Sequence, residues 1–295
     1  MEKMITLIPG HTIKMYEFGS GSPTVLISAG IHACEYIGMN VVEQLVKELE
    51  NTPIKGTLRL IPIMNIEGFY QRSVAVNPVD GKNLNRCFNL EQPLSYSEKL
   101  IQAFEQDYIA KADIYLDLHS GDLQEALYPH LYFNRNASLD TITKAKQLAR
   151  YIDCEFALGS SAAYSSHAGG MKYNVPSLLI ERGGQGQINP QDIALMKQDV
   201  KNLLIGIGVL EGTAKINTKQ NQDLKCEEIE SQNNGKVTCY VKVGECVHEG
   251  DLLIEVETLD GTVDRYHAKE DGKILYITTS YGCFKGQVLI AFTVK

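Results

Sequence analysis

Short apolar runs alternate with longer amphipathic segments through the first two thirds of the chain. The runs have the length and composition of buried strands, and the longer segments carry apolar residues three and four positions apart, as helices do. The predicted strands are 24–27, 57–63, 113–121, 131–133 and 176–184. The predicted helices are 36–50, 97–112, 138–152 and 190–210. The strand–helix–strand order implies βαβ units with parallel strand pairs, so we expect an α/β domain.

The pattern changes near residue 211. Lys, Asn, Gln, Glu and Thr dominate 211–234 and apolar residues thin out, which predicts a domain boundary. Beyond it, 237–295 contains short β-type runs broken by glycines, as in a small all-β module. We therefore divide the chain into a first domain at 1–212 and a linker with a C-terminal β domain at 213–295.

Composition narrows the class of protein. A net charge of -8 argues against a general nucleic-acid binder, which usually has a basic stripe. The N-terminus has no signal-peptide core, and no apolar run approaches the length of a membrane span. The seven scattered cysteines include no C-x-x-C and fit reduced thiols. We expect a cytoplasmic protein with no nucleic-acid and no membrane partner.

Polar residues with catalytic chemistry follow the first predicted strand. Gly30 breaks the strand, and His32 and Glu35 lie on the turn before the helix at 36–50. A His and a Glu three positions apart can face the same way and bind one metal ion. The alternative is a surface histidine with a glutamate favoured by the helix dipole. The spacing alone leaves both interpretations open.

Two further predicted strands end in a titratable residue. His119 precedes a Ser-Gly turn, and Asp117 lies on the same face of the strand, where it could orient the imidazole. A core histidine bonded by backbone is the alternative. Glu181 ends an apolar strand, which is costly if the carboxylate is buried and unpaired but not if it faces a polar site. Arg182 points to the opposite side, so we exclude it from that site.

The stretch 65–89 has no clear period and is long for a connection inside a compact domain. It contains Arg72 and a concentration of Asn, Asp and Arg residues over 77–86, with a turn signal at Asp80-Gly81. A solvated loop is the alternative to a functional one.

These features converge, because the carboxyl ends of parallel strands meet at one edge of a sheet, where ligands bind. Two His and one Glu form a catalytic zinc set with an open fourth position. A separate Glu can take a proton from water, one Arg can polarise a carbonyl, and a second Arg beside an Asn can hold a carboxylate. The combination predicts metal-assisted hydrolysis of an amide next to a carboxylate.

The motifs resemble those of the succinylglutamate desuccinylase/aspartoacylase family, a branch of the zinc carboxypeptidase-like fold. The matching motifs are His32-x-x-Glu35, Asn85-Arg86, Asp117-Leu118-His119 and Ile180-Glu181, with 80–86 the most specific run. The resemblance covers roughly residues 20 to 210. It implies a mixed, largely parallel sheet flanked by helices and a small C-terminal all-β, barrel-sandwich-like domain.

The resemblance also assigns roles to residues. It implies one zinc ion per chain, held by His32, Glu35 and His119, with Glu181 as the base. It further implies Arg72 on the scissile carbonyl, and Asn85 with Arg86 on a substrate carboxylate.

The chain departs from the family pattern at Ala33-Cys34, where members often have Gly and an acidic or amide residue. We interpret Cys34 as a structural thiol, with a redox liability as the alternative. The Ser-, Ala- and Gly-rich segment 156–173 predicts a loop with Tyr164, His167 and Tyr173. We expect each of the three to be core or loop structure rather than a substrate contact.

The β module contains an internal repeat, in which 246–254 is echoed by 283–290 with one residue deleted. Two similar halves predict a sandwich or barrel with pseudo-two-fold symmetry. The module resembles biotinyl/lipoyl-type barrel-sandwich hybrids, whose carrier members need a lysine at a hairpin tip. The corresponding segment 257–261 has none. We therefore expect a lid over the zinc site or a homo-oligomer contact.

We thus predict a zinc-dependent hydrolase that deacylates an N-acyl amino acid or a similar small amide. One alternative is a metallocarboxypeptidase that acts on short peptides, since the same zinc, Glu and Arg would serve. Another, from a different class, is a metal-free binding protein on the same fold.

Overall fold

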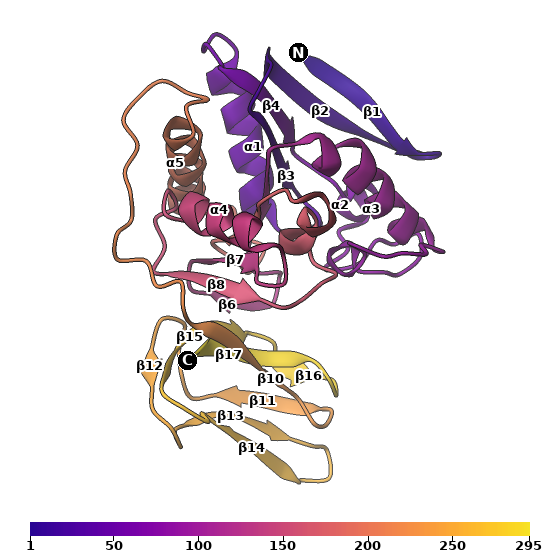
Figure 1. The fold of residues 1–295 in the computed structure, drawn as a ribbon. Helices are drawn as coiled ribbons and strands as arrows, with labels where there is room; N and C mark the ends of the chain where they lie inside the picture. The colour runs from indigo at the N-terminus through magenta and orange to yellow at the C-terminus, as the bar shows by residue number, and fades with distance from the viewer.

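An eight-stranded mixed sheet forms the centre of the computed structural model, which describes residues 1–295 (Figure 1). Its strands are β1 Glu2–Ile8, β2 His11–Ser20, β3 Thr24–Ala29, β4 Gly56–Ile61, β5 Ile114–His119, β7 His130–Asn134, β8 Phe156–Ser160 and β9 Ser177–Glu181. They lie in the order β1-β2-β4-β3-β5-β9-β7-β8. The central strands β4, β3, β5 and β9 are parallel, and β1, β2 and β7 add antiparallel pairs. The expected mixed, largely parallel sheet is confirmed.

Helices cover both faces of this sheet (Figure 1). They are α1 Tyr36–Leu49, α2 Ile66–Gln71, α3 Tyr96–Asp107, α4 Leu139–Ala149 and α5 Pro190–Gly206. One apolar core joins α1, α4 and α5 to one face of the sheet, and a second joins α3 and the β1–β2 hairpin to the other. None of the helices has the length and apolar content needed to cross a membrane.

Two segments that the sequence predicts as loops contain regular structure. Phe156–Ser160 forms the edge strand β8, paired with β7 along its whole length, although the segment 156–173 as a whole is rich in Ser, Ala and Gly. The long stretch 65–89 contains α2 and a one-turn 3₁₀ helix at Leu84–Arg86. Both elements are shorter than the window over which periodicity is detectable.

The turn after β3 depends on two glycines. Gly30 has a φ of +70°, and a Cβ there would lie 2.8 Å from the Met39 side chain. Gly38 lets α1 approach β5 closely, since a Cβ at this position would lie 2.6 Å from the Leu118 carbonyl oxygen. The residues that follow β3 are therefore held directly over the end of β5.

The C-terminal part of the chain forms two antiparallel sheets. The strands are β10 Lys225–Glu230, β11 Gly235–Cys239, β12 Cys246–Val247, β13 Leu252–Glu257, β14 Val263–His267, β15 Gly272–Thr278, β16 Gly282–Cys283 and β17 Val288–Val294. One sheet has the order β14-β13-β11-β16 and the other β10-β17-β15-β12. Strand β11 pairs with the short strand β16, and β15 pairs with the short strand β12. The two halves of the module therefore exchange equivalent strand pairings, as the internal repeat predicts.

A strand from the first two hundred residues joins this module. β6, Glu125–Leu127, pairs antiparallel with β15, so that Leu127 lies opposite Tyr276 and Glu125 opposite Thr278. Figure 1 shows β6 and β8 facing the module. Backbone hydrogen bonds therefore tie the module to the segment that follows β5.

A buried carboxyl group braces the loop that follows β8. Glu105 on α3 accepts a hydrogen bond from the Asn89 backbone N–H at 2.9 Å. The Asn89 side-chain amide in turn donates to the carbonyl oxygens of Ala163 and Ala168, both at 2.8 Å. Asn89 is thus the link between α3 and the segment 163–168.

Burial raises the pKa of Glu105 to about 7 from its ordinary value of 4.5. Because the folded state binds this proton more tightly than the unfolded state, stability should fall as pH rises from about 4.5 to 7. Glu105→Gln keeps the acceptor for Asn89 and removes the proton. At each pH we compare the free energy of unfolding of the wild type with that of the variant. We expect this difference, wild type minus variant, to drop by about 2–4 kcal/mol between pH 5 and 8. Urea titrations at four pH values check this, and parallel pH profiles would contradict it.

Candidate active site

Three side chains at the carboxyl edge of the sheet surround one point. His32 Nδ1 lies 2.6 Å from Glu35 Oε1, and His119 Nδ1 lies 2.9 Å from Glu35 Oε2. The two imidazole rings are edge to face, with centroids 5.0 Å apart. One ligand atom from each of the three residues lies within 4.8 Å of the other two. The structure thus brings together the residues that the spacing suggested as metal ligands.

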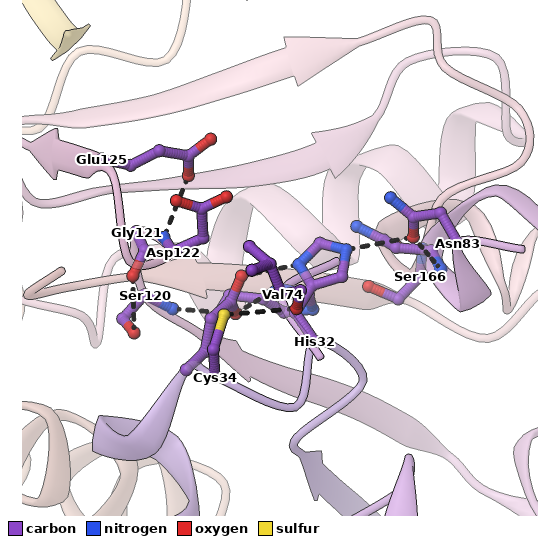
Figure 2. A network of polar contacts seen from close by, with 12 residues as sticks. His32, Cys34, Val74, Asn83, Ser120, Gly121, Asp122, Glu125 and Ser166 are labelled. Carbon is purple, nitrogen blue, oxygen red and sulfur yellow. Dashed lines mark hydrogen bonds and ion pairs between the residues drawn. The ribbon is translucent and has the colours of Figure 1, made fainter. Parts of the chain in front are cut away.

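The strand register explains this convergence. Ala29 at the end of β3 lies opposite Leu118 of β5, and His119 lies opposite Glu181 of β9. Three adjacent parallel strands therefore end at the same level. Figure 2 shows His32 between Asn83 and the turn that carries Ser120 and Asp122.

The second nitrogen of each histidine also faces an oxygen. His32 Nε2 lies 3.0 Å from Asn83 Oδ1, and His119 Nε2 lies 2.6 Å from Asp117 Oδ2. A neutral imidazole has one N–H and cannot satisfy two acceptors. With the N–H groups donated to Asn83 and Asp117, both Nδ1 lone pairs point at the Glu35 carboxylate.

A positive charge is therefore required between the Nδ1 atoms of His32 and His119 and the Glu35 carboxylate. His119 Nδ1 makes no hydrogen bond despite its short distance to Glu35. A divalent cation satisfies two imidazole lone pairs and a carboxylate at once, and metal-bound histidines usually donate their other N–H to a carboxylate or amide oxygen. The donor set fits zinc.

Electrostatics favour a cation at the same point. Burial raises the pKa of Glu35, but the two histidines outweigh it and lower the pKa to about 2, so the carboxylate stays charged. Burial lowers the pKa of His119, whereas Asp117 and Glu35 raise it well above its usual value. The negative charges of Asp117 and Glu35 that raise this pKa also favour a metal cation at the same place.

Glu181 ends β9 beside the cluster of His32, Glu35 and His119 and forms no hydrogen bond with it. Its Oε2 is buried and has no hydrogen-bond partner. Burial raises the pKa of Glu181 well above its usual value, and Glu35 and Glu125 add to the effect, although His119 opposes it. A carboxyl group with a raised pKa is a stronger base than an ordinary carboxylate.

A cavity of about 570 Å³ opens over the cluster. His32, Glu35 and Glu181 line one part of it, and Asn85 and Arg86 line another. The C-terminal module supplies a further wall, with Lys225, Glu228 and Tyr276. The site is therefore built from both parts of the chain.

Asn85 and Arg86 lie on the 3₁₀ turn of the long loop. Asn85 Oδ1 accepts hydrogen bonds from Ser165 Oγ at 3.0 Å and from the Ser166 backbone N–H at 2.8 Å. Arg86 Nη1 donates to the Asn85 carbonyl oxygen at 2.8 Å. The guanidinium group is thus held at the cavity with N–H groups to spare.

Arg72 is not brought to this cavity. It ends α2 with a φ of 55°, and its backbone N–H closes the helix on the carbonyl oxygens of Gly68 and Phe69. Its side chain is exposed and does not line the cavity. The arginine that lines it besides Arg86 is Arg135, which follows β7.

The remaining sequence candidates are placed as follows. Tyr164 is 52% exposed and outside the cavity, and Tyr173 packs against the core under α3. His167 is buried and lines the cavity. Arg182 points away, where it donates to Asp199 at 2.9 Å.

Cys34 lies between His32 and Glu35, two of the candidate metal ligands, as a protonated thiol. Burial raises the pKa of its thiol to about 12, with a smaller contribution from Glu35. Its Sγ donates a hydrogen bond to the Val74 carbonyl oxygen at 3.2 Å. These contacts favour the structural interpretation over a redox liability, because the thiolate is the reactive form.

Sequence reasoning missed several cavity residues. Asn83 belongs to the Asn-rich run but has no distinguishing feature apart from its cap position before the 3₁₀ turn. Asp122 and Glu125 follow the Ser-Gly turn after His119, and the Glu125 carboxylate accepts from the Asp122 N–H at 3.0 Å (Figure 2). Tyr276 reaches the cavity only through the β6–β15 pairing, which carries no local signal.

The model of the succinylglutamate desuccinylase/aspartoacylase catalytic domain matches residues 21–207. Because the match spans more than half of the chain, the protein belongs to this family.

One curated protein and several solved structures are similar to this chain over most of its length. An N-alpha-acetyl-L-2,4-diaminobutyric acid deacetylase of Halomonas elongata is 26% identical over 279 residues, which cover 90% of this chain and 79% of that protein. The product-bound ectoine utilization protein EutE (DoeB) of Ruegeria pomeroyi has a TM-score of 0.85 at 21% identity, covering 97% of this chain and 90% of that one. A succinylglutamate desuccinylase/aspartoacylase of Rhodobacter sphaeroides has a TM-score of 0.83 at 22% identity, covering 97% and 89%.

Proposed function

We propose that this protein is a zinc-dependent deacylase that hydrolyses the amide bond of a small N-acyl amino acid. The observation that carries the proposal is the pair of histidines around Glu35, each facing oxygen through both nitrogens, with the unpartnered Glu181 beside them. Family membership and the deacetylase relative support the same reaction class.

His32, Glu35 and His119 would hold the zinc ion. When bound, zinc supplies Lewis-acid activation of water and of the amide carbonyl. Asn83 and Asp117 fix the orientation of the two imidazoles through their Nε2–H groups.

Glu181 moves the proton. Its carboxylate takes one proton from the attacking water as the new C–O bond forms at the acyl carbon. It then delivers that proton to the amide nitrogen, so that the C–N bond breaks and a carboxylate and an amine leave. The raised pKa of Glu181 suits both steps, since a carboxyl group at its ordinary pKa is a weak base near pH 7.

Arg86 would bind the carboxylate of the amino acid. The hydrogen bond from Nη1 to the Asn85 carbonyl oxygen fixes the guanidinium plane, and the free N–H groups can form a two-point contact with a carboxylate. Asn85 Oδ1 is occupied by Ser165 and Ser166, which leaves its amide N–H₂ as the group for substrate.

The cavity favours a small substrate over a peptide chain. Its volume of about 570 Å³ suits a molecule of the size of an N-acyl amino acid, and the C-terminal module walls one side. A carboxypeptidase needs room for the residues that precede the scissile bond. We therefore retain the carboxypeptidase only as the alternative to be tested.

An amine-release assay with purified protein tests the proposal. The panel contains N-acetyl and N-succinyl derivatives of several amino acids together with dipeptides and tripeptides. We expect release from N-acyl amino acids to exceed release from peptides in kcat/KM. Faster peptide hydrolysis would instead establish the carboxypeptidase, and release from no substrate at any zinc concentration would favour a metal-free binding protein.

Replacing the two loop arginines should have unequal effects. Arg86→Ala removes a charge-assisted contact to the substrate carboxylate, and we expect KM to rise by about 10–100-fold with a smaller change in kcat. Arg72→Ala alters an exposed side chain outside the cavity, and we expect kcat/KM to change by less than about threefold. Steady-state kinetics of both variants check this. A large loss of kcat in Arg72→Ala would restore the carbonyl-polarising role that the family resemblance implies.

A further inference from the structure

His167 carries a buried polar atom that the proposed reaction does not use. It lies on the 3₁₀ turn Ser166–Ala168, is 5% exposed and lines the cavity. Its ring packs against that of Tyr132 at a centroid distance of 5.9 Å and an angle of 33°. Its Nε2 has no hydrogen-bond partner. A buried, unpartnered nitrogen beside a cavity calls for a partner that enters the cavity.

A chain of hydrogen bonds determines which nitrogen of His167 carries the proton. The Ser166 backbone N–H donates to Asn85 Oδ1, which fixes the orientation of the Asn85 amide. The Ser165 hydroxyl donates to the same oxygen at 3.0 Å, and thereby uses its one proton. Ser165 Oγ, 2.9 Å from His167 Nδ1, therefore accepts a hydrogen bond from Nδ1–H. The lone pair is left on Nε2, so this atom can only accept.

The ring stays neutral near physiological pH. Burial lowers the pKa of His167 to about 3, and the positive charge of Arg86 adds to the effect. Protonation therefore does not turn Nε2 into a donor. Any group that pairs with His167 has to bring its own N–H or O–H.

The position of His167 indicates that the amino-acid half of the substrate supplies this N–H or O–H. The hydrogen-bond chain ties it to Asn85, which stands beside the proposed carboxylate site at Arg86. In the proposed reaction the scissile nitrogen lies at Glu181, from which it receives its proton. An acetyl or ionised succinyl group has no N–H or O–H, so the amino-acid side chain remains as the group that can donate a hydrogen bond to His167 Nε2.

We infer that His167 determines substrate specificity by accepting a hydrogen bond from an amine on the side chain of the acylated amino acid. The inference rests on the proposed function and names its substrate class. A carboxylate side chain, as in aspartate or glutamate, has only acceptors and would leave two lone pairs facing each other. Sites built to receive a hydrogen bond discriminate strongly against analogues that lack it.

The charge of the cavity wall supports an amine over a hydroxyl. Five charged residues line the cavity away from His32, Glu35, Glu181 and Arg86. The carboxyl groups of Asp122 and Glu125 lie at half-buried positions, whereas Lys225, Arg135 and Glu228 lie at exposed ones. Carboxylates that line a cavity attract a cationic substrate and disfavour an anionic one.

Four N-acetyl amino acids of similar size test the inference. They differ in the side-chain terminus: 2,4-diaminobutyrate has an ammonium, homoserine a hydroxyl, 2-aminobutyrate no polar group and aspartate a carboxylate. We expect kcat/KM to fall in that order, with at least about tenfold between the first and the third. His167→Phe keeps an aromatic ring against Tyr132. In this variant the kcat/KM ratio between the 2,4-diaminobutyrate and 2-aminobutyrate substrates should shrink from about tenfold to less than about threefold. His167→Gln, which offers an acceptor oxygen, should keep part of it.

An equal loss on all four substrates in His167→Phe would overturn the inference and indicate a structural role. A wild-type preference for aspartate would also overturn it. Both results presuppose turnover, so they differ from failure of the proposed function, in which no substrate is cleaved.

A readout independent of turnover is the ¹⁵N NMR spectrum of the His167 ring. We expect the neutral Nδ1–H tautomer at pH 7, and a shift of the Nε2 resonance on addition of L-2,4-diaminobutyrate but not of L-aspartate. The Nε2–H tautomer, an imidazolium, or an equal response to both amino acids would contradict the inference whatever the activity.

Discussion

Replacing Glu181 with glutamine is expected to lower kcat by about 10²–10⁴-fold, the usual contribution of a general base, while the metal content stays unchanged. The carboxyl group is buried and has no partner on Oε2, and burial raises its pKa. Glutamine has nearly the same shape but cannot accept a proton from water. Because Glu181 is not one of the three ligands, zinc should bind as before.

The matched control for Glu181→Gln is Glu105→Gln. Glu105 is also a buried carboxyl group with a raised pKa, but it lies on α3 and does not line the cavity. We expect its kcat to stay within about threefold of the wild type. Metal analysis and steady-state kinetics of both variants separate a loss of the base from a loss of zinc. Full turnover in Glu181→Gln would remove Glu181 from the mechanism.

Replacing His119 with alanine should abolish both zinc binding and turnover. The substitution removes one of the three candidate ligands and takes away the imidazole that lies between the buried carboxylates of Asp117 and Glu35. We expect activity to fall by more than about 10³-fold at limiting zinc. Asp117→Asn keeps all three ligands and changes only the oxygen that orients His119, so zinc affinity should fall by about 10–100-fold.

Zinc titration with a competing chelator measures both affinities. His248→Ala is the control. His248 is an exposed histidine of the C-terminal module and is distant in sequence from His32, Glu35 and His119. It should retain the wild-type affinity. Stoichiometric zinc in His119→Ala would show that the metal lies elsewhere.

The sequence predicts the metal cluster because local pattern and register act together. His32, His119 and Glu181 each follow a short apolar run, and parallel neighbours in register end at one level. Gly30 marks the turn that His32 occupies. Asp117 is identifiable as the partner of His119 from the two-residue period of a strand, and the structure shows that hydrogen bond at 2.6 Å.

The substrate end of the site is less accessible to sequence reasoning. Asn85 and Arg86 come from the family resemblance, and their contacts depend on Ser165 and Ser166, eighty residues further along the chain. His167 gives no local signal, because its importance comes from a nitrogen left without a partner once the loop has folded.

Long-range pairing also hides the role of the C-terminal module. The strand β6 is three residues long and joins β15 across the two parts of the chain, which brings Tyr276 to the cavity. The module supplies part of the cavity wall, and its role as a lid or as an oligomer contact stays a prediction. Arg72 is a case in which the sequence prediction places a residue at the site and the structure does not. It lies in the loop 65–89 but faces solvent, because α2 ends there.

The most direct test of the account is the zinc content of protein purified without added metal, measured together with amine release from an N-acyl amino acid. The account predicts about one zinc per chain, loss of release on chelation and recovery on addition of zinc. Undiminished amine release from protein that contains no metal would contradict it.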